Sequence, residues 1–158
     1  MRIIVEGIKG VGKTTLINRL ALIFGLQVFH CTEKTVNNTQ LFESMLETDN
    51  WVSDRGPYGQ FVYGDEHLQI GSFSELRKLE VKMLEKEVLV IWMTPDHKEM
   101  RGYDDNVYEE IVKTRRQDYD FNKLKEEDDR FKHIFEKESI IRPKVIRVDI
   151  FGGKKEEL

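Results

Sequence analysis

The first 25 residues constrain the fold most strongly, because an apolar run leads into a glycine-rich loop and then into a helical pattern. Residues 3–5, Ile-Ile-Val, are β-branched throughout, which favours a strand buried on both faces. From Lys13 onward apolar side chains recur at helical spacing as far as Gly25, a residue suited to ending a helix. A strand, a loop and a helix in this order indicate an α/β fold.

The loop itself matches the pattern G-x-x-x-x-G-K-[ST], since residues 7–14 read Gly-Ile-Lys-Gly-Val-Gly-Lys-Thr. Glycines let successive backbone N–H groups turn inward around a phosphate, and the start of the next helix adds positive potential. We expect Lys13 to reach the outer phosphates of a nucleoside triphosphate and the Thr14 hydroxyl to ligate magnesium. The residues predicted to bind the triphosphate are Gly7, Ile8, Lys9, Gly10, Val11, Gly12, Lys13, Thr14 and Thr15.

The rest of the chain alternates strand-like with helix-like segments. Further strands are predicted within residues 26–31, 51–53, 88–93 and 144–149. Helices are predicted at 41–46, after Ser72, whose spacing to Glu75 resembles a capping box, and as two surface helices between 106 and 138. The dipeptide at 94–95, Thr-Pro, is expected to end the fourth strand and to begin a helix. This alternation predicts a three-layer α/β/α fold around a five-stranded parallel sheet.

The length, the charge and the single cysteine of the chain narrow the class of protein further. A chain of 158 residues is expected to form one domain, spanning 1–158. The net charge of -4 argues against binding to a nucleic acid polymer or to an anionic membrane. Cys31 is the only cysteine, so no intramolecular disulfide is possible and a cytoplasmic location is expected. No stretch has the length and apolarity of a membrane-spanning helix or the pattern of a signal peptide.

Two motifs together resemble a known superfamily. Residues 6–16 read E-G-I-K-G-V-G-K-T-T-L and resemble the E-G-x-x-G-x-G-K-T-T loop shared by thymidylate kinases and deoxynucleoside kinases. Asp54-Arg55 resembles the D-R or E-R dipeptide that both families place beside the phosphates. Alone this dipeptide is more typical of a polar turn, but its position after the third strand favours a site. The resemblance implies ATP and Mg²⁺ as cofactors, with Asp54 near the metal and Arg55 gripping the acceptor.

Three further segments contain candidate residues that the same families suggest. Glu33 lies in a segment similar to the Thr-Glu-Pro of deoxynucleoside kinases, whose Glu is the catalytic base; because the Pro is missing here, a solvated carboxylate is an equal alternative. Arg101 begins a segment that resembles the start of a short lid, near 96–118, which closes over the triphosphate. Arg115 and Arg116 also lie there, although an exposed helix face explains them better. Tyr63 falls where these kinases contact the acceptor base, although aromatics at this spacing more often belong to the core.

Lys9 departs from the family pattern. Thymidylate kinases usually carry an acidic residue at this loop position, where it contacts the acceptor. Acceptor recognition is therefore expected to differ here, or Lys9 adds a positive charge facing an acceptor that already carries a phosphate.

The first hypothesis is a magnesium-dependent kinase that moves the ATP γ-phosphoryl group to a (deoxy)nucleoside monophosphate, with Lys13, Asp54, Arg55 and Arg101 as catalytic residues. The alternative is a deoxynucleoside kinase, which phosphorylates a 5'-hydroxyl and needs Glu33 as a base. A GTPase is disfavoured because no N-K-x-D segment occurs late in the chain, and a non-catalytic nucleotide-binding module is less favoured. The expected partner is a small nucleoside or nucleotide, and related kinases are commonly homodimers. The acceptor base stays open.

Overall fold

The computed structural model of the chain describes residues 1–31, 39–63, 70–95 and 121–148. The elements follow one another as β1 (Arg2–Gly7), α1 (Lys13–Phe24), β2 (Gln27–His30), α2 (Thr39–Glu47), β3 (Trp51–Asp54), α3 (Gly59–Tyr63), α4 (Phe73–Glu85), β4 (Leu89–Pro95), α7 (Phe121–His133), the π-helical turn η1 (Ile134–Glu138) and β5 (Lys144–Val148). The predicted five strands are all present. The predicted lid near 96–118 lies outside the described residues.

The five strands form one parallel sheet in the order β2-β3-β1-β4-β5. β1 lies at the centre, and its side chains Ile4 and Val5 are fully buried because both faces of the strand are covered. The register places Val5 opposite Asp54 on β3 and opposite Ile91 on β4. The carboxyl end of β1 thus lies between those of β3 and β4, at the edge where parallel sheets bind ligands.

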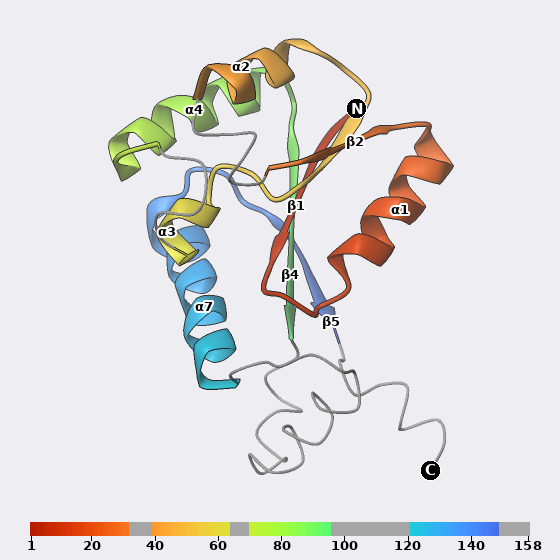
Figure 1. Ribbon diagram of the computed structural model, residues 1–158. Helices are drawn as coiled ribbons and strands as arrows, with labels where there is room; N and C mark the ends of the chain where they lie inside the picture. Colours follow the sequence, from red (N-terminus) through yellow and green to blue (C-terminus); the bar gives the residue numbers. More distant parts are fainter. Residues whose placement is uncertain (32–38, 64–69, 96–120, 149–158) are drawn as a thin grey trace, which may run out of the picture.

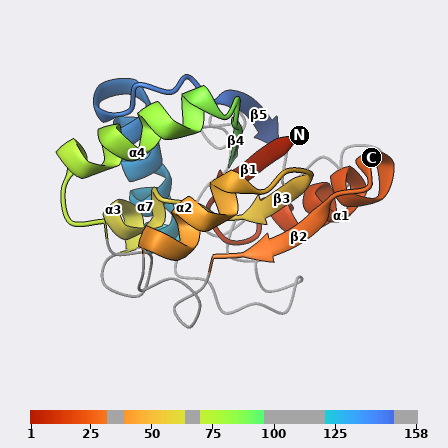
Figure 2. The same cartoon turned by 90° about the horizontal axis from the view of Figure 1, so that it is seen from above.

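Helices cover both faces of this sheet. α1 packs against β1, β2 and β3 on one face, and α2, α3, α4 and α7 lie on the other (Figure 1). The view from above shows the same separation, with α1 apart from the group formed by the other four helices (Figure 2). The predicted three-layer α/β/α arrangement is confirmed.

Local signals set the ends of two helices as predicted. α1 is followed by Gly25, whose φ of 65° is left-handed and whose N–H donates to the Ala21 carbonyl. α4 begins with the predicted capping box, in which the Ser72 side chain accepts from the Glu75 N–H and the Glu75 side chain accepts from the Ser72 N–H.

The end of β4 differs from the prediction. The strand runs through Pro95, which lies opposite Val148 of β5, and does not stop at Met93. Proline is tolerated there because β1 already ends opposite Met93, so β4 has only one neighbouring strand at that point. Pro95 is therefore a strand residue and not, as the sequence had suggested, the first residue of a helix, and the residues that follow it lie outside the described part. Of the two helices expected between 106 and 138, the described part contains α7 with its π-helical turn, whose buried stripe is Leu124, Phe131, Ile134 and Phe135.

Among the described residues, no helix combines the length and the apolar character that crossing a membrane requires.

Candidate functional site

The glycine-rich loop joins the carboxyl end of β1 to the first turn of α1. Gly10 and Gly12 have φ values of 88° and 92°, which side chains rarely allow. A Cβ on Gly7 would lie 2.4 Å from the Met93 carbonyl oxygen, so the loop can approach β4 only because residue 7 has no side chain. α1 has no side-chain cap and no acidic residue in its first turn, so its positive end suits an anion. Lys9, Thr14 and Thr15 are exposed along this loop and the first turn of α1.

Lys13 is folded onto the loop that precedes it. Its Nζ donates to the Gly7 carbonyl at 2.7 Å and to the Ile8 carbonyl at 2.9 Å, and the side chain is buried. The pKa of Lys13 is lowered to about 8, chiefly by burial and also by the nearby charge of Arg55, against opposing contributions from carboxylates. Reaching an outer phosphate therefore requires the ammonium group to exchange these two carbonyls for phosphate oxygens.

Asp54 ends β3 and Arg55 follows it, and both lie beside the loop because β3 pairs with β1. The Arg55 N–H donates to the Val5 carbonyl at 2.9 Å, and Arg55 takes a left-handed φ of 70°. The Ser53 hydroxyl holds this turn by donating to the Arg55 carbonyl at 2.6 Å. A non-glycine residue with positive φ is uncommon and marks a turn that the surrounding structure imposes. The turn thereby brings the two residues of the Asp-Arg motif to the carboxyl edge of β1.

The Asp54 carboxylate fits a magnesium ion. Its Oδ2 lies 3.3 Å from His30 Nδ1, whereas its Oδ1 is buried without a hydrogen-bond partner among the described residues. No group of three or more His, Cys, Asp or Glu side chains in the described part of the chain could hold a metal ion. A single carboxylate oxygen such as Asp54 Oδ1 suits Mg²⁺, which proteins commonly bind through one or two oxygen ligands together with substrate phosphates. Thr14, in the first turn of α1, is the second expected ligand.

Tyr63, at the end of α3, lies between Arg55 and the loop. Its hydroxyl donates to the Gly7 carbonyl at 3.1 Å, and the guanidinium carbon of Arg55 lies 5.0 Å from the centre of its ring. The edge-to-face contact with Phe131 of α7, at 5.8 Å between ring centres, supports the ring from a third direction. The acceptor-base contact expected for Tyr63 stays a prediction, while these contacts place its hydroxyl on the loop.

Glu6 is a site residue that the sequence did not single out. It is fully buried in β1, its Oε1 accepts from the Gly56 N–H at 2.8 Å, and its Oε2 has no partner among the described residues. Burial raises the pKa of Glu6 to about 7, although the Gly56 hydrogen bond and the charges of Arg55 and Lys13 oppose that rise. A Cβ on Gly56 would lie 2.8 Å from Ile4 Cγ2, so only glycine allows this approach. The resemblance did include Glu6, but it assigned no role to the residue.

Glu127 of α7 is the second carboxylate that the sequence did not reveal. Its side chain is 7% exposed, and burial raises its pKa against the opposing charges of Lys123, Arg130, Arg55 and Lys13. Every residue from 125 to 130 is charged, so no local pattern distinguishes it. The site thus combines two cations, Lys13 and Arg55, with carboxylates from β1, β3 and α7.

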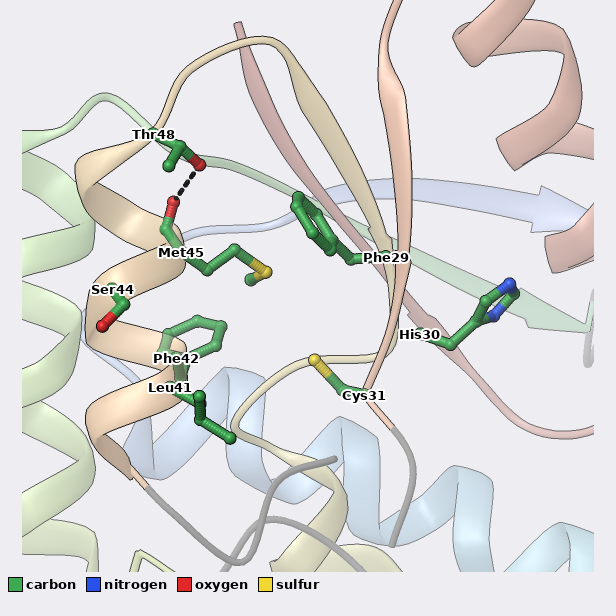
Figure 3. A pocket seen from close by; sticks show the side chains of 8 residues that line it. All are labelled: Phe29, His30, Cys31, Leu41, Phe42, Ser44, Met45 and Thr48. Carbon is green, nitrogen blue, oxygen red and sulfur yellow. Dashed lines mark hydrogen bonds between the residues drawn. The ribbon is translucent and has the colours of Figure 1, made fainter. Parts of the chain in front are cut away.

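An apolar pocket of about 310 Å³ lies between β2 and α2. Leu41, Phe42 and Met45 of α2 face Phe29 and Cys31 across it (Figure 3). Among the described residues, its lining consists of Phe29, His30, Cys31, Leu41, Phe42, Ser44, Met45 and Thr48. The pocket adjoins the motif turn, because His30 contacts the Asp54 carboxylate and the Cys31 N–H donates to the Asp54 carbonyl at 3.0 Å.

The structure therefore brings Lys13, Asp54, Arg55 and Tyr63 together at one edge of the sheet. Glu33, Arg101, Arg115 and Arg116 lie outside the described residues.

Comparison with known proteins adds one finding. No family model and no curated protein matches the sequence. Among solved structures, the chain is similar to the YorR protein of Bacillus subtilis, whose crystal structure was determined in complex with phosphorylated GDP. The TM-score is 0.70 at 19% identity, over 95% of this chain and 86% of that one. This likeness confirms the α/β fold with its five-stranded parallel sheet.

Proposed function

We propose that this chain is a magnesium-dependent kinase that transfers the γ-phosphoryl group of ATP to a (deoxy)nucleoside monophosphate. The observation that carries the proposal is the meeting of Lys13 with Asp54 and Arg55 at the carboxyl edge of β1 and β3. A module that only binds a triphosphate has no need of a guanidinium held in a left-handed turn beside the phosphate loop. A phosphoryl acceptor supplies that need, because its own phosphate must be gripped close to the donor.

Each group has a defined part in the transfer. The loop amides and Lys13 hold the triphosphate, and Arg55 holds the acceptor phosphate in line with the γ-phosphorus. An acceptor phosphate oxygen bonds to that phosphorus while the bond to the β–γ bridging oxygen breaks, and ADP leaves with the electron pair. Thr14 and Asp54 would hold magnesium, which would neutralise part of the charge on the β- and γ-phosphates. Arg101 remains the candidate to close over the triphosphate.

The pocket between β2 and α2 is our candidate for the acceptor base. Its apolar walls and its volume of about 310 Å³ suit a planar ring. His30, at its edge, contacts Asp54, so an acceptor bound there would direct its phosphate toward the motif turn. The phosphorylated nucleotide bound to YorR supports a nucleotide as the ligand class for this fold.

A coupled assay of ADP release against a panel of nucleosides and nucleoside monophosphates tests the proposal. Turnover with a monophosphate, abolished by Lys13→Ala, is the expected result. The alternative, a deoxynucleoside kinase, predicts turnover with nucleosides and its loss on Glu33→Ala. The absence of acceptor-dependent ADP release with every compound in the panel would overturn the kinase assignment.

Substitution of Arg55 tests whether this residue binds the phosphate of a monophosphate acceptor. Arg55→Ala is expected to raise the KM for the monophosphate at least about tenfold, because a charge-assisted pair with a phosphate is lost. Arg77→Ala provides the matched control, since Arg77 pairs with Glu138 on the surface at 2.9 Å. Equal KM values for the two variants would show that Arg55 does not bind the acceptor.

A further inference from the structure

We propose that Tyr63 is a positioning residue that keeps the triphosphate loop in its phosphate-binding shape and links it to Arg55. The link to Arg55 rests on the proposed function, in which Arg55 binds the acceptor. The role of Tyr63 in shaping the loop requires only that the loop binds a triphosphate.

The Gly7 carbonyl is the point at which the two halves meet. In this structure it accepts from Lys13 Nζ at 2.7 Å and from the Tyr63 hydroxyl at 3.1 Å. When a triphosphate binds, Lys13 turns to the phosphates and its bond to this buried carbonyl is lost. The Tyr63 hydroxyl then remains as a donor to the same oxygen, which avoids the cost of an unpaired polar group at the end of β1. The loop can thus release its lysine without losing the anchor of its first residue.

Tyr63 is itself held from two directions. Arg130 of α7 donates to the Val62 carbonyl at 2.8 Å, and Phe131 of the same helix packs edge-on against the Tyr63 ring. Burial raises the pKa of the Tyr63 hydroxyl well above its usual value, so it stays a donor at physiological pH. The contacts between α3 and α7 therefore hold the Tyr63 hydroxyl in position to donate to the Gly7 carbonyl.

The same ring supports Arg55, whose guanidinium carbon lies 5.0 Å from the ring centre. One side chain thus contacts the donor loop through its hydroxyl and the acceptor arginine through its face. A residue that instead contacted the acceptor base would influence acceptor binding and leave triphosphate binding unchanged. The two roles are separable by experiment.

Tyr63→Phe removes the hydroxyl and keeps the ring. We expect it to weaken binding of a fluorescent, non-hydrolysable ATP analogue by about 3- to 10-fold, the usual effect of one lost hydrogen bond, and to leave the acceptor KM unchanged. Tyr58→Phe is the matched control, because the Tyr58 hydroxyl donates to Glu80 at 3.0 Å, away from the loop. Tyr58→Phe should lower the melting temperature without altering affinity for the analogue, which separates a local effect on the loop from general destabilisation.

Tyr63→Leu removes the ring as well. Relative to Tyr63→Phe, it should raise the acceptor KM by a further factor of about 2 to 5, because Arg55 loses its aromatic support. The proposal is overturned if Tyr63→Phe binds the analogue as tightly as the wild type, if it changes only the acceptor KM, or if the wild type binds no triphosphate. A lack of turnover with every acceptor would contradict the proposed function but not the role of Tyr63 in the loop, since binding of the analogue needs no acceptor.

Discussion

The Oε1 atom of Glu6, fully buried in the central strand, accepts a hydrogen bond at 2.8 Å from the backbone N–H of Gly56. One carboxyl group inside β1 therefore holds the turn that presents Arg55, although the two lie far apart in the sequence. Because this group is buried and its pKa is raised to about 7, its protonation connects the stability of the protein to pH.

Glu6→Gln is expected to remove part of the pH dependence of stability. The pKa of Glu6 is about 7 in the folded protein against 4.5 for an unburied Glu, so its protonated form stabilises the fold below pH 4.5 and this contribution is lost as pH rises through 7. Gln mimics the protonated form at all pH values. Wild type and variant should unfold with similar free energies near pH 4, and the variant should be more stable at pH 8 by on the order of 3 kcal/mol. Parallel profiles from chemical denaturation at both pH values would contradict this expectation.

Lys13→Met should abolish triphosphate binding and stabilise the free protein. Burial lowers the pKa of Lys13 from 10.5 to about 8, so its charged form destabilises the fold below pH 8 and this penalty disappears by pH 10.5. The stability advantage of Lys13→Met over the wild type should therefore shrink as pH rises from 7.5 to 10.5, measured by thermal unfolding. Lys78→Met, on the exposed face of α4, is the control and should show no such trend. An advantage that stays constant with pH would refute the buried-charge explanation.

Gly7→Ala should disrupt the loop. A Cβ there would lie 2.4 Å from the Met93 carbonyl oxygen, a backbone atom that cannot move without disturbing β4. We expect at least a tenfold loss of affinity for the ATP analogue, measured by fluorescence titration, and destabilisation of about 1–3 kcal/mol. Gly25→Ala is the matched control, since Gly25 also has positive φ but a Cβ there would meet nothing within 4 Å. That control should cost about 1 kcal/mol and keep full affinity. An equal loss of affinity in both variants would show that general destabilisation, and not the contact with β4, weakens binding.

Leu41→Trp should fill the pocket between β2 and α2. Leu41 lines this pocket and is half exposed, so a larger ring can enter it without entering the core. The acceptor KM is expected to rise at least about fivefold while affinity for the ATP analogue is unchanged, because the pocket is apart from the triphosphate loop. Leu22→Trp, on an exposed position of α1, serves as the control. An unchanged acceptor KM in steady-state kinetics would exclude this pocket as the base site.

Some parts of the fold follow from signals within a few residues of sequence. The capping box at Ser72 and the left-handed Gly25 were predictable because each depends on residues at most four positions apart. The extension of β4 through Pro95 was not, because it depends on where β1 ends and β5 continues. Whether a strand can contain proline depends on which strands lie beside it, and those strands are far away in the sequence.

The sequence alone predicted the five strands found in the described part of the chain and a loop with the G-x-x-x-x-G-K-[ST] pattern, since apolar periodicity and the glycine, lysine and threonine spacing are local properties. Only the tertiary structure decided that β3 lies beside β1, and with it that Asp54 and Arg55 border the loop. It also decided that Glu6 is fully buried against Gly56 and that the Tyr63 hydroxyl reaches the Gly7 carbonyl. These last two contacts join residues fifty or more positions apart, so they arise from strand order and helix packing, which no local pattern of residues encodes.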